Sequence, residues 1–489
     1  MKNFTFNKQF MVLMFLLLNC FASYAANGDL ITKQITLKLT EAGTLPNKIV
    51  SNKKDLVTNL KIIGEINGTD LRFIREMAGS DVKGNSTSGN LSVLDLSEAK
   101  FVAGGDYYYK DYEDGCYTSN DIIGKYAFRD CKSLTSVIIP SSVTRIGEHA
   151  FWGCSSLTSV NIPSSVTRIG DKAFLSCSSL TSVDIPSSVT EIGGGAFDGC
   201  SSLTSVIIPS SVTEIRKFTF WCCSSLTSVN IPSSVTEIGN NAFGRCGSLT
   251  SVNIPSSVTS IGNYAFVRCS SLTSINIPSS VTSIGFNAFS DCCSLTSVII
   301  PSSVTKIGKA AFSKCSSLTS VNIPSSVTEI GEYTFLGCSS LTSVNISSGV
   351  TVIGGGAFEN CSSLTSINIP SSVTSIGERA FENCSGLRSV YVYAETPPSI
   401  SANAFEGCDL KNCTFYVPKG TYDAYWLSEW GDFENIVEFD ATNIRNIVAE
   451  PEVQETARYA VNGQRLTAPI KGINLVKYNN GRVKKEIVK

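Results

Sequence analysis

The chain has 489 residues, only 16% of them charged, and a formal net charge of −2. A globular chain averages roughly 25% charged residues, so this surface is unusually neutral and lacks the basic stripe that nucleic-acid binding requires. The single His excludes His-rich metal sites and disfavours a catalytic His, and the length points to several domains or a repeat array.

The N-terminal segment predicts a signal peptide over residues 1–25. Lys2 and Lys8 precede an apolar run from Phe10 to Leu18, and small residues follow it. We therefore expect the mature chain to be exported.

The same segment leaves a second interpretation open. Cys20 could carry a lipid, although Asn19 stands where a small residue normally precedes such a Cys. The apolar run is too short to span a bilayer, and nothing downstream is long and apolar enough to do so. Either interpretation predicts a protein at the cell surface, associated with the outer membrane, or in the extracellular medium.

Residues 26–115 are expected to cap the array that follows. Ile31 to Leu39 alternates as a strand, and Leu91 to Leu96 has the L-x-x-L-x-L spacing of a degenerate repeat. A cap is needed because the open end of an array exposes apolar residues and strand edges. The Tyr- and acid-rich stretch from Gly104 to Gly115 is interpreted as a solvated loop, with ligand contact as the alternative.

Residues 116–389 form a repeat array with a period of 23 residues. A Phe recurs at this step, and a Cys follows each Phe by three residues, from Cys131 to Cys384. A divergent copy follows with Phe405 and Cys408. A fixed period of this length indicates a solenoid.

One unit shows how the chain is expected to wind. Leu157, Val160 and Ile162 form L-x-x-V-x-I, whose alternation predicts a strand with Asn161 facing outward. Pro163 ends the strand because it has no N–H for the ladder.

The second half of the unit returns the chain to the next coil. Gly170 is expected to permit a tight bend, and Ala173-Phe174 a short helical or 3₁₀ turn that carries Phe into the core. No unit buries its apolar residues alone, so stacked units share one core. The predicted fold is a repeat solenoid with a parallel sheet on its concave face and short strands and turns on its convex face.

This unit resembles the BspA-like type of leucine-rich repeat, also described from treponemal surface proteins. The family pattern, C-x-x-L-x-x-I-x-I-P-x-x-V-x-x-I-G-x-x-A-F, matches residues 123–408 almost unit for unit. Arg216 departs from it in place of Gly, Ser347 in place of Pro, and Thr219 and Thr334 in place of Ala. We expect these changes to relax the bend locally without breaking the array. The resemblance implies a surface protein of Bacteroidota that adheres to extracellular-matrix proteins.

Residues 390–440 are expected to cap the other end of the array. A predicted helix from Thr421 to Trp430 would place Tyr425, Trp426 and Trp430 over the last core layer. These aromatic side chains are interpreted as core residues rather than as a binding cage.

Residues 441–489 are basic, with nine Lys and Arg against four Asp and Glu. Tyr459–Leu466, Pro469–Val476 and Val483–Lys489 predict short strands joined by Gly turns. The segment resembles the C-terminal sorting domain of type IX secretion substrates, with Asn474 where an aromatic residue is common. That resemblance implies surface attachment through this tail. A small β add-on without a sorting role is the alternative.

Thirteen of the 18 Cys occupy one position of the repeat. Parallel ladder positions hold Cβ atoms farther apart than the roughly 3.8 Å of a disulfide, so we interpret these Cys as buried thiols that pack as small apolar residues. The sequence contains no C-x-x-C pair, which argues against a zinc site. Cys408 and Cys413 are the best candidates for a disulfide, and no metal or cofactor is predicted.

The sequence offers no recognisable catalytic arrangement. His149 is interpreted as a solvated residue of the convex turn, not placed to activate a nucleophile. Glu191, Glu214 and Glu237 would stack as like charges, without the cleft that a glycosidase needs. The chain is predicted not to be an enzyme, and a carbohydrate-processing enzyme is the weakest alternative.

The outward strand positions define the candidate ligand-binding surface. They read Thr-Ser and then Asn in most copies, which makes a polar, uncharged face, with Ile138, Asp184, Ile207 and Ile299 interrupting the Asn row. The concave face of a solenoid is its usual binding surface. The candidate residues are Thr158, Asn161, Asp184, Thr227, Asn230, Thr250, Asn253, Thr273, Asn276, Thr319 and Asn322.

Two functions fit these observations. The first is adhesion by a monomeric surface protein whose partners are host extracellular or cell-surface proteins, glycans or other bacterial cells, and not nucleic acid. The second is a structural spacer or coat element with no specific ligand, which the near-identical repeats favour.

Overall fold

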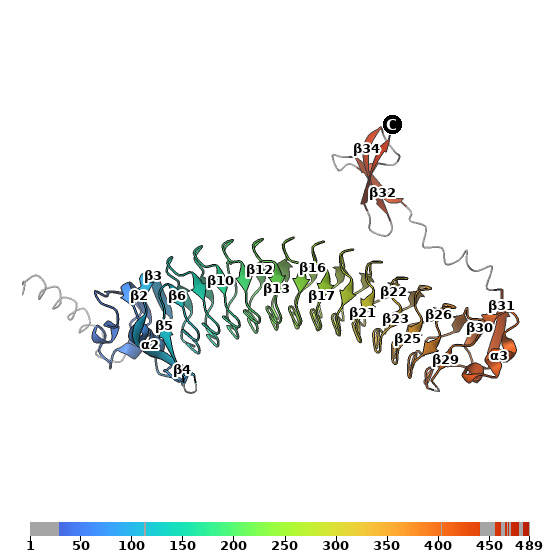
Figure 1. Cartoon of the computed structure of the whole chain (residues 1–489), viewed down its shortest axis with the longest axis horizontal. Coiled ribbons are helices and arrows are strands. Elements are labelled where there is room, and N and C mark those ends of the chain that lie inside the picture. The colour runs from blue at the N-terminus through green and yellow to red at the C-terminus, as the bar shows by residue number, and fades with distance from the viewer. Residues whose placement is uncertain are drawn as a thin grey trace, which may run out of the picture.

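The computed structural model describes residues 29–111, 114–401 and 403–440, and in the tail residues 455–460, 465–466, 468, 471–478 and 483–488. The predicted signal peptide and Cys20 lie outside the described residues. Between residues 29 and 440 the chain winds into stacked coils that form a curved rod (Figure 1). None of the helices in this part has the length and apolar character needed to cross a bilayer.

The first strand of each coil has the predicted alternation. In β9 (Ser159–Asn161) the middle residue is buried and its two neighbours are exposed. Adjacent strands are parallel and in register, as in the pairing of β12 (Ser205–Ile207) with β14 (Ser228–Asn230). We call the outward side of this series the strand face. Its other members are β7 (Ser136–Ile138), β16 (Ser251–Asn253), β18 (Ser274–Asn276), β20 (Ser297–Ile299), β22 (Ser320–Ile323), β24 (Ser343–Ile346), β26 (Ser366–Ile369) and β28 (Ser389–Val392).

A second, shorter strand follows in each coil. In β10 (Arg168–Ile169) the Arg is exposed and the Ile is buried, and the strand pairs in parallel with β8 (Arg145–Ile146) and β11 (Glu191–Ile192). We call this series the second strand row. Its other members are β6 (Ile122–Ile123), β13 (Glu214–Ile215), β15 (Glu237–Ile238), β17 (Ser260–Ile261), β19 (Ser283–Ile284), β21 (Lys306–Ile307), β23 (Glu329–Ile330), β25 (Val352–Ile353), β27 (Ser375–Ile376) and β29 (Ser399–Ile400). These two parallel rows confirm the predicted solenoid.

The rest of each coil is a turn segment, which comprises residues 147–154 and their equivalents at 23-residue steps. The N–H of Phe151 donates to the carbonyl of Ala173 in the next coil (2.7 Å), whereas the N–H of Trp152 donates to His149 in its own coil (3.2 Å). Alternate amides therefore bond between coils, and the segment is a stack of turns. The predicted helical or 3₁₀ turn is wrong, because a helix would direct every amide along its own axis.

Glycine at the end of the second strand has a different role from the one predicted. The φ of Gly170 lies outside the left-handed range, so backbone freedom is not what the position requires. A Cβ there would lie 2.7 Å from the backbone of Glu148 in the preceding coil, closer than side-chain atoms approach. The tight spacing of the coils excludes a side chain at this position.

Two coils depart from this spacing. The buried hydroxyls of Thr219 and Thr334 donate to the carbonyls of Arg216 (2.7 Å) and Gly331 (2.8 Å). The nearest neighbour of a Cβ at Gly331 would be 3.5 Å away, so the coils stand farther apart here. The wider gap explains how a coil with Thr in place of Ala also accommodates Arg216 in place of Gly.

The second strand row is interrupted at both of these coils. The sheet containing β11 ends before β13, and the sheet containing β21 ends before β23. Backbone bonding on the strand side continues across both interruptions. At the first, the N–H of Thr204 donates to the carbonyl of Thr181 (3.2 Å), although residues 182–184 are not assigned as a strand; at the second, β20 pairs with β22. The expectation that these substitutions relax the array without breaking it is confirmed.

The N-terminal region extends the strand-face sheet. β1 (Ile35–Lys38), β2 (Asn59–Ile66) and β3 (Val93–Phe101) are parallel to one another and pair onward with β7. The short helices η1 (Leu45–Asn47) and η2 (Lys54–Leu56) lie between β1 and β2 in the chain. Three further coils, rather than a separate lid, therefore precede the regular array.

The Tyr- and acid-rich stretch is an ordered hairpin, so its prediction as a solvated loop is wrong. β4 (Gly104–Asp111) and β5 (Asp114–Thr118) are antiparallel, and β4 contacts α2 (Gly68–Met77). Tyr108 is buried, and its hydroxyl donates to the carbonyl of Lys125 at 2.8 Å. Tyr109, the next residue, is buried as well, so this stretch packs against the array instead of extending into solvent.

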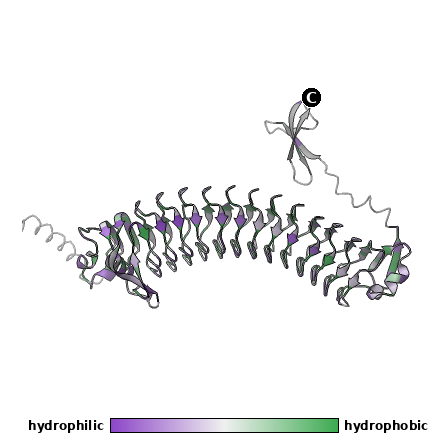
Figure 2. Ribbon diagram, in the orientation of Figure 1, coloured by the Kyte–Doolittle hydropathy of each residue, from purple (hydrophilic) through white to green (hydrophobic). Residues whose placement is uncertain are grey.

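The core is a continuous column of apolar side chains inside the coils. Phe174 and Phe197 stack with ring centroids 5.4 Å apart and planes 2° apart, and similar stacking runs from Phe128 to Phe405. Aromatic stacking in this column therefore repeats from each coil to the next. Hydrophilic residues also recur from coil to coil, on the strands (Figure 2).

The C-terminal end of the rod is closed by β30 (Thr414–Pro418), β31 (Asn435–Phe439), α3 (Tyr422–Trp426) and η3 (Glu429–Asp432) (Figure 1). Tyr425 and Trp430 are buried, as predicted. The indole of Trp430 stacks on Phe415 at 4.9 Å and donates to the carbonyl of Pro398 at 2.8 Å.

Two predictions for this end are wrong. Trp426 is 56% exposed and does not cover the core, because α3 is one turn long and presents a single side to the coils. Cys408 and Cys413 are free thiols rather than a disulfide. The Cys408 thiol instead donates to the carbonyl of Phe381 at 3.1 Å, as the ladder Cys do in their own coils.

The described part of the tail is a four-stranded antiparallel sheet in the order β33-β32-β34-β35. Its strands are β32 (Glu455–Ala460), β33 (Arg465–Leu466), β34 (Gly472–Tyr478) and β35 (Val483–Val488). The predicted short strands are confirmed there, whereas the sorting role stays a prediction.

Candidate functional site

All eleven predicted ligand-binding residues are exposed on the strand side of the array. Asp184 lies in a segment, residues 182–184, that is not assigned as a strand. The others fall into two rows, as the in-register pairing of Asn253 with Asn230 and Asn276 shows. The rows are one of Thr (Thr158, Thr227, Thr250, Thr273, Thr319) and one of Asn (Asn161, Asn230, Asn253, Asn276, Asn322).

The Thr hydroxyls are already used within the fold. The hydroxyl of Thr158 donates to the carbonyl of Thr135 in the preceding coil at 2.9 Å, and that of Thr227 donates to Thr204 at 3.1 Å. The same bond recurs at Thr250, Thr273 and Thr319. Because each hydroxyl has one proton, these Thr offer a ligand acceptor lone pairs and a methyl group, but no donor. Sequence reasoning missed this ladder, since it depends on the spacing of the coils.

The Asn row supplies the donors of the strand face. Neighbouring amides lie within reach of one another, as Asn345 Nδ2 and Asn322 Oδ1 show at 2.6 Å. Exposed Ile207 and Ile299 divide the row at 70% and 61% exposure. Amide groups repeated at a fixed step can both donate and accept hydrogen bonds without net charge, and Asp184 adds a single negative charge.

Arginines relieve the predicted stack of like charges on the second strand row at Glu191 and Glu214, whereas Glu237 pairs in register with Glu214. Glu191 lies 3.1 Å from Arg168 and 2.6 Å from Arg216, and Arg216 also approaches Glu214 at 3.5 Å. These side chains are partly exposed ion pairs that neutralise each other. The sequence feature that could have indicated this pairing is Arg216, which stands in place of the Gly of the repeat.

His149 is buried, so its interpretation as a solvated residue is wrong. Its side chain is stacked between Tyr126 and Trp152, with ring centroids 5.1 and 4.9 Å away. Burial lowers the pKa of the imidazole, and Glu148, 3.0 Å from Nδ1, opposes that shift. The environment is that of a packed aromatic cluster.

The ladder Cys are buried thiols, as predicted. The Cys177 thiol donates to the carbonyl of Phe151 at 3.2 Å, and this bond recurs in the neighbouring coils. Burial raises the pKa of the Cys177 thiol well above its ordinary value. Such thiols are protonated and inert as nucleophiles at neutral pH.

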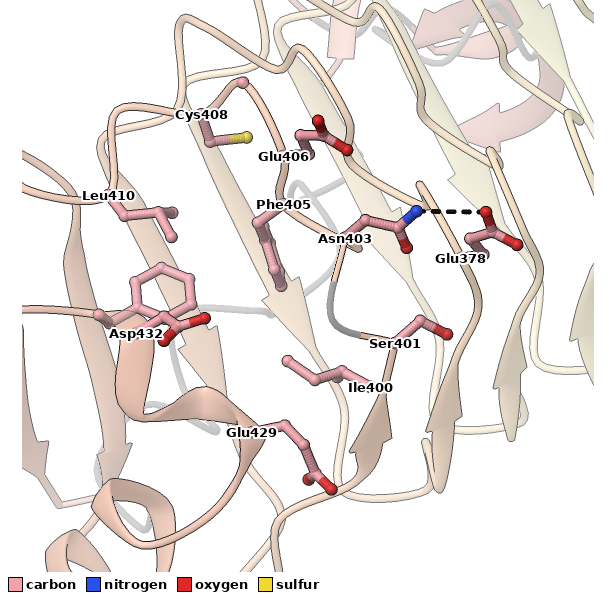
Figure 3. Close-up of a pocket in the computed structure, with 12 residues that line it drawn as sticks. Glu378, Ile400, Ser401, Asn403, Phe405, Glu406, Cys408, Leu410, Glu429 and Asp432 are labelled. Carbon is pink, nitrogen blue, oxygen red and sulfur yellow. Dashed lines mark hydrogen bonds between the residues drawn. The ribbon is translucent and has the colours of Figure 1, made fainter.

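A cavity of about 700 Å³ opens beside the C-terminal end of the array (Figure 3). Phe405, Ile400 and Leu410 line it together with four carboxylate side chains, and Asn403 donates to Glu378 at 3.2 Å. The four carboxylates are Glu378, Glu406, Glu429 and Asp432. Within the described residues, no three His, Cys, Asp or Glu are grouped to hold a metal ion. Sequence reasoning missed this cavity, because its lining comes from three separate segments.

Comparison with known proteins identifies the repeat. A family model described as the BspA type leucine rich repeat region matches residues 121–249, 236–365 and 312–428, which together exceed half of the chain. No curated protein sequence matches the chain.

Solved structures with the same kind of repeat are also similar. A leucine-rich repeat protein from Bacteroides ovatus is 34% identical over 68% of this chain and 90% of that chain, with a TM-score of 0.54. A leucine rich cell surface protein from Faecalibacterium prausnitzii is 31% identical over 70% of this chain and 89% of that chain, with a TM-score of 0.40.

Proposed function

This chain belongs to the BspA type leucine-rich repeat family, and from that premise we propose that it is a non-enzymatic adhesion protein of the cell surface. The proposal assigns binding of a protein or a glycan to the strand face of a monomeric array. The observation that carries it is the exposed row of Asn amides, repeated in register from coil to coil.

A repeated array suits an extended partner. Each Asn amide and each Thr oxygen contributes one weak hydrogen bond, so affinity accumulates when one partner contacts several coils at once. Host extracellular or cell-surface proteins, glycans and the surfaces of other bacterial cells all present repeated polar groups. The proposed contact residues are Thr158, Asn161, Asp184, Thr227, Asn230, Thr250, Asn253, Thr273, Asn276, Thr319 and Asn322.

Export and attachment belong to the same proposal. The apolar N-terminal segment supports secretion, and the basic β-rich tail supports attachment to the outer membrane surface through a sorting step. Deleting residues 441–489 should release the protein from the cell surface into the medium, as measured by surface labelling and blotting of the medium.

The binding test uses residues 26–489 on immobilised matrix proteins, a glycan array and whole cells. We expect binding that is lost when Asn230, Asn253 and Asn276 are all replaced by Ala. The matched control replaces Ser233, Ser256 and Ser279 by Ala. These residues are exposed and belong to the same three coils, but they lie outside the strand face. Equal losses in both variants, or no binding to any of the three, would overturn the proposal.

A structural spacer is the second candidate, favoured by the internal use of the Thr hydroxyls. A spacer needs its length but no particular coil. Deleting two whole repeats would then leave the cellular phenotype unchanged, whereas an adhesion protein would lose affinity with each coil removed.

A further inference from the structure

The chemical variety of the array is concentrated in the turn segments. On the strand face the same Thr stands in every regular coil from Thr135 to Thr365, and the Asn row changes only at Ile138, Asp184, Ile207 and Ile299, so most coils look alike on that face. One turn position, by contrast, differs in almost every coil. It is occupied in order by Tyr126, His149, Lys172, Gly195, Phe218, Asn241, Tyr264, Asn287, Ala310, Tyr333, Gly356 and Arg379. A partner that binds at one particular place on the rod is therefore expected to contact the turn segments.

An aromatic side chain lies flat across one part of this surface. A Cβ at Gly244 would overlap the indole of Trp221 from the preceding coil and would lie 3.0 Å from Val267 in the following coil. Gly244 thus lets the indole lie over its backbone, pointing toward Val267. Phe218 meets the indole edge-on, with centroids 5.8 Å apart.

The aromatic surface continues over the next coils. Tyr264 and Phe286 are in edge-to-face contact at 5.1 Å, and Tyr264 shares a turn segment with Val267. Phe218 and Phe286 are 37% and 39% exposed. We call Phe218, Trp221, Tyr264 and Phe286 the turn-face aromatic patch; it spans four consecutive coils.

Cationic side chains surround this patch. The guanidinium of Arg245 lies 5.3 Å from the centre of the Trp221 ring. Lys217 and Arg268 are exposed on the same turn segments, and Arg268 has Asp291 at 3.9 Å as a partner. These segments also contain Arg216, which pairs with Glu191 and Glu214. The other three cations stand against one carboxylate of the segments, Asp291, which favours an anionic partner.

We propose that the turn-face aromatic patch binds an acidic polysaccharide. The C–H face of a sugar ring would stack on the flat indole of Trp221, while Arg245 and Lys217 would pair with carboxylate or sulfate groups. The half-buried flat ring of Trp221 suits a sugar face better than an acidic peptide, whose charged side chains gain little from stacking. This site is separate from the strand face, so either can fail without the other.

The test measures the affinity of residues 26–489 for polygalacturonate and chondroitin sulfate by titration calorimetry, with dextran and polyglutamate alongside. We expect binding to at least one acidic polysaccharide, weakened about tenfold by Trp221→Ala and by Arg245→Gln. We expect weaker binding to dextran, which lacks charge, and to polyglutamate, which lacks sugar rings. The asparagine variants of the strand face should bind as the unmodified protein does.

Trp152→Ala is the matched control. Trp152 occupies the position of Trp221 in an earlier coil, but the guanidinium of Arg129 lies over its ring at 3.9 Å, closer than the 5.3 Å between Arg245 and the Trp221 ring. Its replacement should leave polysaccharide binding unchanged. The proposal is overturned if neither polysaccharide binds, if Trp221→Ala and Trp152→Ala weaken binding equally, or if polyglutamate binds as tightly as the polysaccharides and regardless of Trp221.

Discussion

At the scale of single residues, burial decides the chemistry of the ionisable groups in this array. The carboxyl of Asp198 stands in a turn segment, in the coil before that of Trp221. Burial raises its pKa to about 6, and the nearby Lys172 only partly opposes the shift. The ionised form of Asp198 is therefore unfavourable in the folded chain.

The sign of this shift gives a pH dependence. An Asp in the unfolded chain ionises near pH 4, roughly its ordinary value, while folded Asp198 keeps its proton up to about pH 6. Stability is accordingly lost as the pH rises from about 4 to about 6, and it stays lost above that range. Asp198→Asn removes the ionisation and should raise Tm at pH 7.5, with little change at pH 4.

Thermal unfolding of both proteins across pH 4–8 checks this expectation. Exposed Asp184 serves as the control, since Asp184→Asn removes a charge from solvent and should shift Tm little at any pH. A difference for Asp198→Asn that is constant over the whole range would contradict the assignment.

At the scale of the element, the distance between coils determines which residues the second strand row tolerates. A Cβ at Gly262 would lie 2.7 Å from the backbone of the preceding coil, whereas one at Gly331 would meet nothing closer than 3.5 Å. Neither Gly has a left-handed φ, so the two sites differ in space rather than in backbone strain.

Gly262→Ala should therefore destabilise the protein by about 1–3 kcal/mol, the usual range for overpacking. Gly331→Ala should change the free energy of unfolding by no more than about 0.5 kcal/mol. Denaturant unfolding of the two variants measures both values. Equal effects would show that the wider gap beside Thr334 does not govern the tolerance of the position.

The same elements show how far the sequence predicts the structure. The 23-residue period and the L-x-x-V-x-I pattern identify the solenoid, the strand face and the buried Cys, because those features follow from local alternation. The role of Gly170, the neutralisation of Glu191 by Arg216 and the bonding of the Thr hydroxyls were missed, since each depends on the distance between coils. The prediction of a helical turn is wrong because the amides of the turn segments bond alternately within a coil and to the next coil.

The candidate site was likewise predicted in part, where it depends on local alternation, and missed where it depends on contacts between distant segments. Exposure of the eleven strand-face residues follows from alternation and was predicted, whereas the burial of His149 depends on Tyr126 from the preceding turn segment and on Trp152 from its own. The cavity near Phe405 joins segments of the array and of its C-terminal end, and no single stretch of sequence carries its pattern.

At the scale of the whole molecule, each coil is held chiefly by its two neighbours. In the regular array the strand pairs and the Thr hydroxyl bonds join residues one repeat apart, and a core Phe such as Phe174 stacks on the Phe of each adjacent coil. Stability in such an array is a sum of unit and nearest-neighbour contributions. Removing one complete unit therefore deletes one set of neighbour contacts and rejoins two equivalent surfaces.

Deleting residues 155–177 removes one period and joins Cys154 to Ser178, so that Phe151 meets Phe197 in the register that Phe174 left. We expect this variant to fold with an unchanged circular dichroism signal per residue and a Tm lowered by no more than about 5 °C. Deleting only residues 155–166 removes half a period and turns buried positions outward, so that variant should unfold or aggregate. The nearest-neighbour account fails if the two deletions are equally damaging, because the register of the 23-residue unit would then not be what joins one coil to the next.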